Sequence, residues 1–272
     1  MNTLALLPKL MVAPNGAHLG KADHSQLPLT IDEIAEAARQ CQLAGADGIH
    51  VHIRDAEGRH LLDAGVYREA IKEITRQAPG MQIQITTEAA GRYQPDAQRQ
   101  VVYDLQPTSA SVAWREMQRE IDAAKLWGFY HWAAAREIAL QHIFYCPEEL
   151  TDFLQAWVQA GMTQRKLQCL FVLGRRNKPA TPDDITPWIN AMHSWRKQES
   201  NKGNALNLEW AVCAFGQHET DCLIAAAGYG GKLRIGFENN RWREDGKLAQ
   251  DNAERVAELV ARLRSDVSIA GN

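Results

Sequence analysis

The stretch GADGIHVHIRD places two histidines one residue apart in an otherwise apolar run. Alternate side chains of a β-strand point to opposite faces, so His50 and His52 share one face and the apolar side chains between them share the other. Two buried imidazoles without partners are costly to desolvate, whereas a bound metal ion uses both as ligands. The spacing therefore predicts a metal site. The alternative is a histidine pair that is hydrogen-bonded to neighbouring carboxylates or to water.

A third ligand is predicted in LRIGFENN, near the end of the last apolar run. Strand alternation puts Arg234, Gly236 and Glu238 on a common face. Two histidines and one carboxylate suit catalytic zinc and equally non-haem iron(II), so a divalent metal other than Zn²⁺ stays open. The planar fork of Arg234 is suited to the carboxylate of an anionic substrate. The alternative for Glu238 is a helix cap or an ion pair, for example with Arg241.

Further polar residues follow the ends of other predicted strands. Glu88 is a candidate general base, and a solvated loop carboxylate is an equally good interpretation. The run LGRRN has two guanidinium groups that could hold phosphates, although adjacent arginines are more often solvated surface. The candidates for substrate binding all lie at or just beyond a predicted strand end: Asn15, His18, Thr86, Thr87 and Gly216.

Eight short apolar runs, each followed by a segment with helical periodicity, must position these groups. One such segment, 30–46, begins with a capping box of Thr30 and Glu33. Eight units predict a (β/α)₈ TIM barrel, whose active site lies at the carboxyl ends of the strands. An open doubly wound sheet is disfavoured because the glycines after the first strand open no helix directly. The predicted strands are 7–14, 48–54, 81–87, 109–114, 142–146, 167–173, 206–215 and 232–238. The segment 115–140 could hold one bent helix or two.

The composition narrows the class of protein. The 272 residues, of which 45% are hydrophobic, can bury a large core, and α/β barrels reach this length as one unit. We therefore predict a single domain over 1–272. The net charge of −3, with scattered Lys and Arg, argues against nucleic acid or an anionic membrane as a partner.

The first apolar run and the cysteines bear on the cellular compartment of the protein. Pro8 and Lys9 interrupt the first apolar run, which is too short for a signal or membrane segment. Five cysteines without a C-x-x-C pair indicate reduced thiols. Together these features predict a cytoplasmic protein.

The combined motifs resemble the β-keto acid cleavage enzymes, typified by 3-keto-5-aminohexanoate cleavage enzyme. The resemblance is carried by APNGAH, by the segment from LPLTIDEIAEAARQCQLAGADGIHVHIRD to GRH, and by QITTEAAG, WAVCAFG, GGKLRIGFENN and GKLAQDNAERV. It implies a (β/α)₈ barrel, a divalent metal, usually zinc, on His50, His52 and Glu238, and a substrate-binding Arg234. It also implies condensation of a β-keto acid with acetyl-CoA, which gives acetoacetate and a new CoA ester, and a homotetramer.

The sequence departs from the family at several positions of the site. Asn239 stands where most members have an aspartate that pairs with the arginine, and an amide cannot take a proton. Asn15 and Glu88 replace a threonine and a glycine. His18 replaces the glutamate that contacts the substrate amine in the aminohexanoate enzyme. These differences predict a substrate without a cationic tail, and Glu88 as the base, with Asp55 or His18 behind it.

Three other functions remain as alternatives. Metal-dependent hydrolases of the amidohydrolase type carry H-x-H on the first strand and further histidines after the fifth and sixth, which this chain does not match. A class II aldolase uses a metal without CoA. A catalytically degenerate barrel would bind metal or ligand without turnover.

Overall fold

The computed structural model describes residues 5–200 and 206–270. Within these residues, eight parallel strands close into a barrel in the order β1, β10, β9, β8, β7, β6, β5, β2. Every neighbouring pair is parallel, so all eight carboxyl ends open at one mouth. The strands are β1 Leu10–Val12, β2 Gly48–Val51, β5 Gln82–Thr86, β6 Ser109–Ala113, β7 Ala139–Phe144, β8 Lys166–Leu173, β9 Asn207–Ala214 and β10 Lys232–Ile235.

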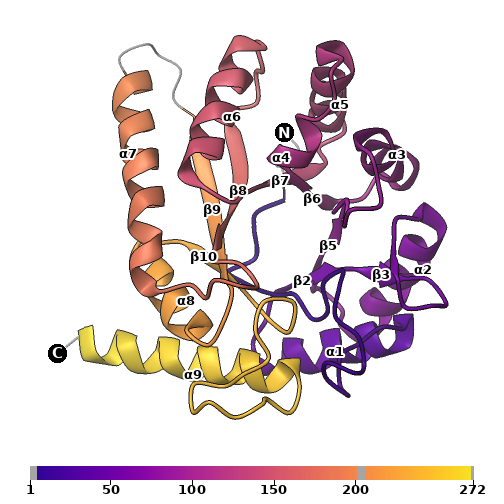
Figure 1. The fold of residues 1–272 in the computed structure, drawn as a ribbon, viewed down its shortest axis with the longest axis vertical. Coiled ribbons are helices and arrows are strands. Elements are labelled where there is room, and N and C mark those ends of the chain that lie inside the picture. The colour runs from indigo at the N-terminus through magenta and orange to yellow at the C-terminus, as the bar shows by residue number, and fades with distance from the viewer. Residues whose placement is uncertain (1–4, 201–205, 271–272) are drawn as a thin grey trace.

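Helices form an outer ring around the barrel, which Figure 1 shows nearly end on. The chain thus alternates strand and helix as the repeated pattern predicted, and the TIM barrel is confirmed. The helices are α1 Ile31–Ala44, α2 Ala64–Gln77, α3 Pro95–Leu105, α4 Trp114–Met117, α5 Ala123–Ala135, α6 Pro147–Gln159, the 3₁₀ turn η1 Pro182–Ile185, α7 Thr186–Ser200, α8 Glu219–Gly228 and α9 Asn252–Ala270. No helix in the described ranges is long and apolar enough to cross a membrane.

Local sequence accounts for the ends of α1. The Thr30 hydroxyl accepts from the Glu33 amide, and the Glu33 carboxylate accepts from the Thr30 amide, so the predicted capping box is confirmed. Gly45 ends the helix with φ of 115°, a conformation that glycine adopts without a Cβ clash. The helix therefore starts and stops where short-range chemistry dictates, and it delivers the chain to β2.

The barrel strands separate two kinds of interior. Ile49 and Val51 point outward into the apolar layer between strands and helices. The lumen is divided: one side is polar and includes His50, Gln84 and Arg234, and the other is apolar. The apolar side is built by β6 to β9 and joins Ala113, Ile143, Val172 and Cys213, with Phe215 packed against it. A ligand in the mouth therefore meets a polar wall and an apolar wall.

Some predicted boundaries are wrong. The fifth barrel strand is 139–144 instead of 142–146, so His142 lies inside the strand, not at its beginning. The last strand ends at Ile235, and Glu238 lies in the turn that follows it. The run 48–54 leaves the barrel at His52, and β3 Ile53–Arg54 pairs antiparallel with β4 His60–Leu61. The segment 115–140 holds two helices, the short α4 and α5.

Candidate active site

Three potential metal ligands converge at the barrel mouth. Nε2 of His50 lies 3.1 Å from Nε2 of His52, and Oε2 of Glu238 lies 3.9 Å and 3.6 Å from these two nitrogens. A tetrahedral zinc with Zn–N bonds of 2.0–2.1 Å separates its nitrogen ligands by about 3.3 Å. Oε2 of Glu238 is buried and has no hydrogen-bond partner among the described residues. The donor set therefore fits a small divalent cation.

A chain of amides fixes the tautomer of His50. The Cys169 carbonyl can only accept, so Nε2 of Gln141 donates to it at 3.3 Å. Oε1 of Gln141 then accepts from Nε2 of Gln84 at 3.0 Å, which leaves Oε1 of Gln84 to accept from Nδ1 of His50 at 2.8 Å. Nδ1 of His50 consequently carries the proton, and Nε2 presents its lone pair to the mouth.

His52 is held where the chain leaves the barrel. Nδ2 of Asn15 donates to the carbonyls of His52 and Pro28, each at 2.9 Å, and thereby ties the loop after β1 to the end of β2. The His52 ring is buried, and its Nδ1 lies 3.8 Å from Oε2 of Glu88. Asn15 also lines the cavity, where it was predicted to bind substrate. Its hydrogen bonds show that it has a structural role as well.

Glu238 is positioned by backbone that packs unusually closely. Gly236 adopts φ of 145°, and a Cβ there would lie 2.4 Å from the Ala13 carbonyl oxygen. The Glu238 amide donates to that same oxygen at 3.1 Å. A Cβ on Gly16, which has φ of 63°, would lie 2.7 Å from Cγ of Glu238. Only glycine fits at both positions, and the carboxylate is brought over the histidines as a result.

The loop bearing Glu238 is also tied to the outer ring. Oδ1 of Asn252, in the first turn of α9, accepts from the Phe237 amide at 2.9 Å, and its Nδ2 donates to the Pro14 carbonyl at 3.0 Å. Beneath this loop, Arg255 and Glu219 form a fully buried ion pair of 3.0 Å. These contacts explain why the segment GKLAQDNAERV belongs to the site although it contains no ligand.

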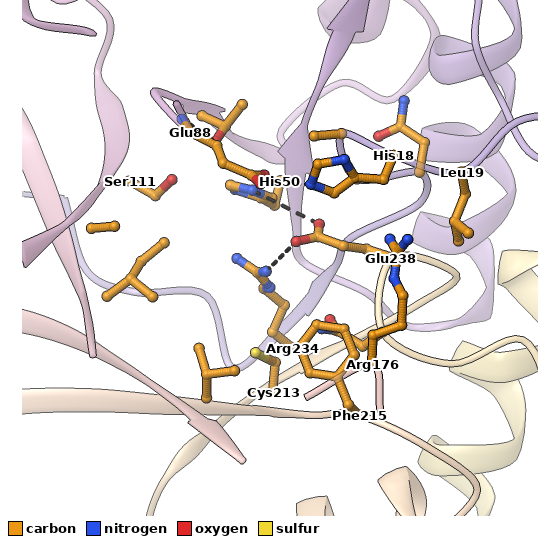
Figure 2. Close-up of a pocket in the computed structure, with 18 of the residues that line it drawn as sticks. His18, Leu19, His50, Glu88, Ser111, Arg176, Cys213, Phe215, Arg234 and Glu238 are labelled. Atoms are coloured by element: carbon orange, nitrogen blue, oxygen red, sulfur yellow. Dashed lines mark hydrogen bonds and ion pairs between the residues drawn. The ribbon is translucent and has the colours of Figure 1, made fainter. Parts of the chain in front are cut away.

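Arg234 lies beside the predicted metal ligands, and two of its hydrogen-bond donors have no partner among the described residues. Nη2 donates to Oε1 of Glu238 at 2.7 Å (Figure 2), whereas Nε and Nη1 are buried without a partner in the described part of the chain. Its side chain is 4% exposed. Two unsatisfied donors on a buried guanidinium are costly unless a ligand accepts from them. Arg234 is therefore placed to bind an anionic oxygen.

Burial and neighbouring charge shape the electrostatics of the site. Burial, with the nearby Arg234 cation, holds the pKa of His50 well below its usual value. Burial and the neighbouring His50 lower the pKa of His52 in the same way. Burial raises the pKa of Glu238, although Arg234 opposes this shift. Both imidazoles are consequently neutral near pH 7, which is the protonation state that metal ligation requires.

Glu88 and His18 form the outer rim of the polar wall. Oε1 of Glu88 lies 3.4 Å from Nε2 of His18, and Figure 2 shows both side chains directed into the pocket near His50. The Glu88 amide donates to Oγ1 of Thr86 at 3.0 Å, so Thr86 orients the residue predicted as a base. Thr87 is fully buried and donates to the Ser111 carbonyl at 2.8 Å, away from the cavity.

Two other predicted residues lie in different surroundings. Asn239 lines the cavity and is 8% exposed, and neither its Oδ1 nor its Nδ2 has a partner among the residues described. Gly216 is outside the cavity lining, with φ of 98°, and a Cβ there would lie 2.7 Å from Cβ of Pro179. Its observed role is a close backbone approach between two loops.

The cavity has a volume of about 420 Å³. Sequence reasoning missed several of its wall residues. Ser111 and Ile143 could have been found by extending strand alternation to β6 and β7, but Tyr145 lies beyond the end of β7 and had no such signal. The lining outside the predicted site includes Ser111, Ala113, Ile143, Tyr145, Val172, Arg176, Cys213 and Phe215.

Known proteins resemble this chain in sequence and in fold. A 3-keto-5-aminohexanoate cleavage enzyme from Fusobacterium nucleatum is 26% identical over an alignment of 270 positions, which covers 96% of this chain and 93% of that protein. A 3-oxoadipate:acetyl-CoA acetyltransferase from Cupriavidus necator is 26% identical, and the alignment covers 93% of this chain and 87% of that protein. The structure of ObcA in ternary complex with a C4-CoA adduct and oxalate superimposes with a TM-score of 0.65 at 13% identity.

The fold likeness to ObcA extends over 89% of this chain, which spans 64% of the ObcA chain. The family model of the β-keto acid cleavage enzymes matches residues 9–267, nearly the full length. The resemblance read from the sequence motifs is thus confirmed. This barrel belongs to the β-keto acid cleavage enzyme family.

Proposed function

We propose that this protein is a metal-dependent enzyme that condenses a β-keto acid with acetyl-CoA and cleaves it, giving acetoacetate and a new CoA ester. The observation that carries the proposal is the convergence of His50, His52 and Glu238 beside the unsatisfied donors of Arg234. His50, Glu238 and Arg234 line one cavity of a barrel of this family. Acetyl-CoA as co-substrate is supported by the name of the Cupriavidus necator relative.

The chain's own groups suit each part of this reaction. A Zn²⁺ ion, or another divalent cation, would be held by His50, His52 and Oε2 of Glu238 and would supply Lewis acidity to the keto oxygen of the substrate. Nε and Nη1 of Arg234 would bind the substrate carboxylate, because a guanidinium fork matches two oxygens at once. The amide of Asn239, which has no protein partner among the described residues, would orient the substrate from the same side.

The wall opposite the ligands favours a substrate without a cationic tail. Ala113, Ile143 and Val172 line that side and accept apolar groups. Arg176 and His18 stand at the rim, where a positively charged tail would meet like charge or lose hydration. We therefore propose an aliphatic, hydroxylated or anionic β-keto acid.

Glu88 is the general base in this proposal. Its carboxylate lies in the cavity within 4 Å of both His18 and His52. Asp55 is instead engaged by Arg59 and Arg92 and lies outside the cavity lining. Glu88→Gln should lower kcat by about 10² to 10⁴-fold while metal content is unchanged, since the amide keeps the shape but cannot take a proton. Unchanged kcat would remove Glu88 from this role.

We also propose one domain over the whole chain, a homotetramer and a cytoplasmic location. Light scattering coupled to size exclusion tests the oligomer. Limited proteolysis tests how far along the chain the single domain extends.

The reaction is tested by joining metal analysis to a turnover screen. Purified protein, assayed for zinc and iron, is mixed with acetyl-CoA and a panel of β-keto acids, and CoA ester formation is followed. We expect stoichiometric metal and turnover that requires acetyl-CoA. Cleavage without acetyl-CoA would indicate an aldolase, and preference for the 5-amino substrate would overturn the proposed tail chemistry. Stoichiometric metal without turnover of any acid would indicate a degenerate barrel.

A further inference from the structure

A second hollow opens beside the active-site cavity. It has a volume of about 400 Å³ and shares Tyr145, Val172 and Phe215 with that cavity. The shared residues form a common wall, so a ligand that lies along them can reach from one hollow into the other. The second hollow, called here the basic hollow, is otherwise lined by Arg115, Cys146, Pro147, Leu173, Gly174, Arg175, Lys178, Asp184, Pro187 and Trp188.

A tight turn after β8 supplies cations to the basic hollow. The amide of Arg175 donates to the Lys178 carbonyl, and the Lys178 amide donates to the Arg175 carbonyl, each at 2.8 Å. Gly174 has φ of 66°, and a Cβ there would lie 2.7 Å from the Lys178 carbonyl oxygen and from the Ala180 amide nitrogen. The turn is thus a closed hairpin with two cationic side chains, Arg175 and Lys178, three positions apart.

These cations have no anionic partner among the described side chains. No carboxylate whose side chain the structure describes forms an ion pair with Arg175, Arg176 or Lys178. By contrast, Arg59 is paired with Asp55 and Arg76 with Glu73. The turn therefore concentrates uncompensated positive charge at one side of the mouth.

The turn is also fixed in place relative to the active site. The Ala180 amide donates to the Phe215 carbonyl at 2.8 Å, and the side chain of Phe215 lines both hollows. Pro179 packs on Gly216, where the absence of a Cβ allows the close approach. A cationic turn held in this way loses less conformational entropy on binding an anion than a free loop does.

Arg115 is a third cation in the lining of the basic hollow. Its guanidinium stacks over the Tyr145 ring at 3.9 Å and pairs with Glu149 at 2.7 Å. The carboxylate of Asp184, also in the lining, accepts from Thr181 as part of the cap of η1. The carboxylates near the basic hollow are therefore already engaged, and the net charge available to a ligand is positive.

We propose that the basic hollow binds the phosphates of the CoA portion of acetyl-CoA, with the adenosine 3′-phosphate and the pyrophosphate on Arg175, Lys178 and Arg115. The proposal rests on the proposed function. β8 stands opposite β2 in the strand order of the barrel, so the pantetheine arm would cross the mouth along Tyr145 and Phe215 toward His50. Guanidinium and ammonium groups donate to phosphate oxygens, so these side chains favour a ligand that carries phosphates.

The test compares two thioesters that differ only in the phosphate-bearing part. For the double variant R175A/K178A, we expect KM for acetyl-CoA to rise by about 10-fold or more, since two charge-assisted contacts are lost. KM and kcat for S-acetylpantetheine, which has no phosphate, should stay as in the wild type. The matched control R68A/K72A removes the same charge from the exposed face of α2, across the barrel, and should leave both thioesters unchanged.

A binding measurement separates failure of this proposal from failure of the reaction. Adenosine 3′,5′-bisphosphate is titrated into the wild type and both double variants by calorimetry. Binding that R175A/K178A loses and R68A/K72A keeps supports the basic hollow even if no β-keto acid is turned over. If the wild type does not bind this probe, or if R175A/K178A has the wild-type KM for acetyl-CoA, the proposal is overturned.

Discussion

Nη2 of Arg234 donates to Oε1 of Glu238 at 2.7 Å, while Oε2 of the same carboxylate faces Nε2 of His52 at 3.6 Å. The two oxygens of one side chain thus have different partners. One accepts from a buried cation, and the other is buried without a hydrogen-bond partner among the described residues. Nε and Nη1 of Arg234 remain without a partner among the described residues, so the proposed substrate carboxylate could accept from them.

Replacing Arg234 should separate substrate binding from metal binding. Arg234→Met removes the donors for the carboxylate, so we expect kcat/KM to fall by about 10³-fold or more. Arg234→Lys should recover part of the loss because it restores the charge without the fork. Zinc content, measured on the same samples, should remain near stoichiometric. Retention of kcat/KM within 10-fold in the methionine variant would show that the substrate is held elsewhere.

Removing the charge of Glu238 should remove the metal. Glu238→Gln keeps the shape of the side chain but replaces a charged ligand with a neutral amide, so we expect zinc affinity to fall by about 10²-fold or more. Competition with a chromophoric chelator measures this change. Glu88→Gln is the matched control, since that carboxylate is outside the ligand set. A normal zinc affinity in Glu238→Gln would exclude the carboxylate as a ligand.

The amide chain behind His50 makes a second prediction about affinity. Gln84→Leu deletes the acceptor for Nδ1 of His50 and should weaken zinc binding by about 10 to 100-fold. Gln84→Glu keeps an acceptor at that position and should bind zinc more tightly than the leucine variant. The readout is the zinc dissociation constant, with circular dichroism as a check on folding. Equal affinity in all three proteins would mean that the tautomer of His50 is fixed in another way.

His142 predicts a pH dependence of stability that is independent of the site. Burial lowers the pKa of this side chain to about 3, and its ring packs against Phe153 at 4.5 Å. In the unfolded chain the pKa is about 6.5, so the unfolded state takes up the proton first as the pH falls. The stabilising contribution is therefore present above pH 6.5 and is lost between about pH 6.5 and 3.

The variant His142→Phe isolates this contribution. Between pH 7 and pH 5, the wild type should lose about 2 kcal/mol more of its free energy of unfolding than the variant does. Urea unfolding at both pH values measures the difference. Equal losses of stability in the two proteins would contradict the prediction, because they would mean that His142 takes up a proton equally in the folded and the unfolded state over this pH range.

The sequence by itself determined features that depend on short-range geometry. Alternation along a strand puts His50 and His52 on one face whatever the rest of the chain does, and the helix cap of Thr30 and Glu33 needs only its own turn. The repeat of eight strand and helix units predicted the barrel, because that pattern has few compact solutions. Two of the three candidate metal ligands were therefore placed on one face before any coordinates.

Tertiary structure alone decided the features that depend on contacts between distant segments. Glu238 reaches the histidines from a turn, not from a strand, because Gly236 bends the chain against the Ala13 carbonyl, and strand alternation cannot be extended through such a bend. The partner of His50, Gln84, comes from the neighbouring strand, whose register no local pattern specifies. The basic hollow likewise exists only because the turn after β8 packs on the end of β9, a contact that sequence periodicity does not encode.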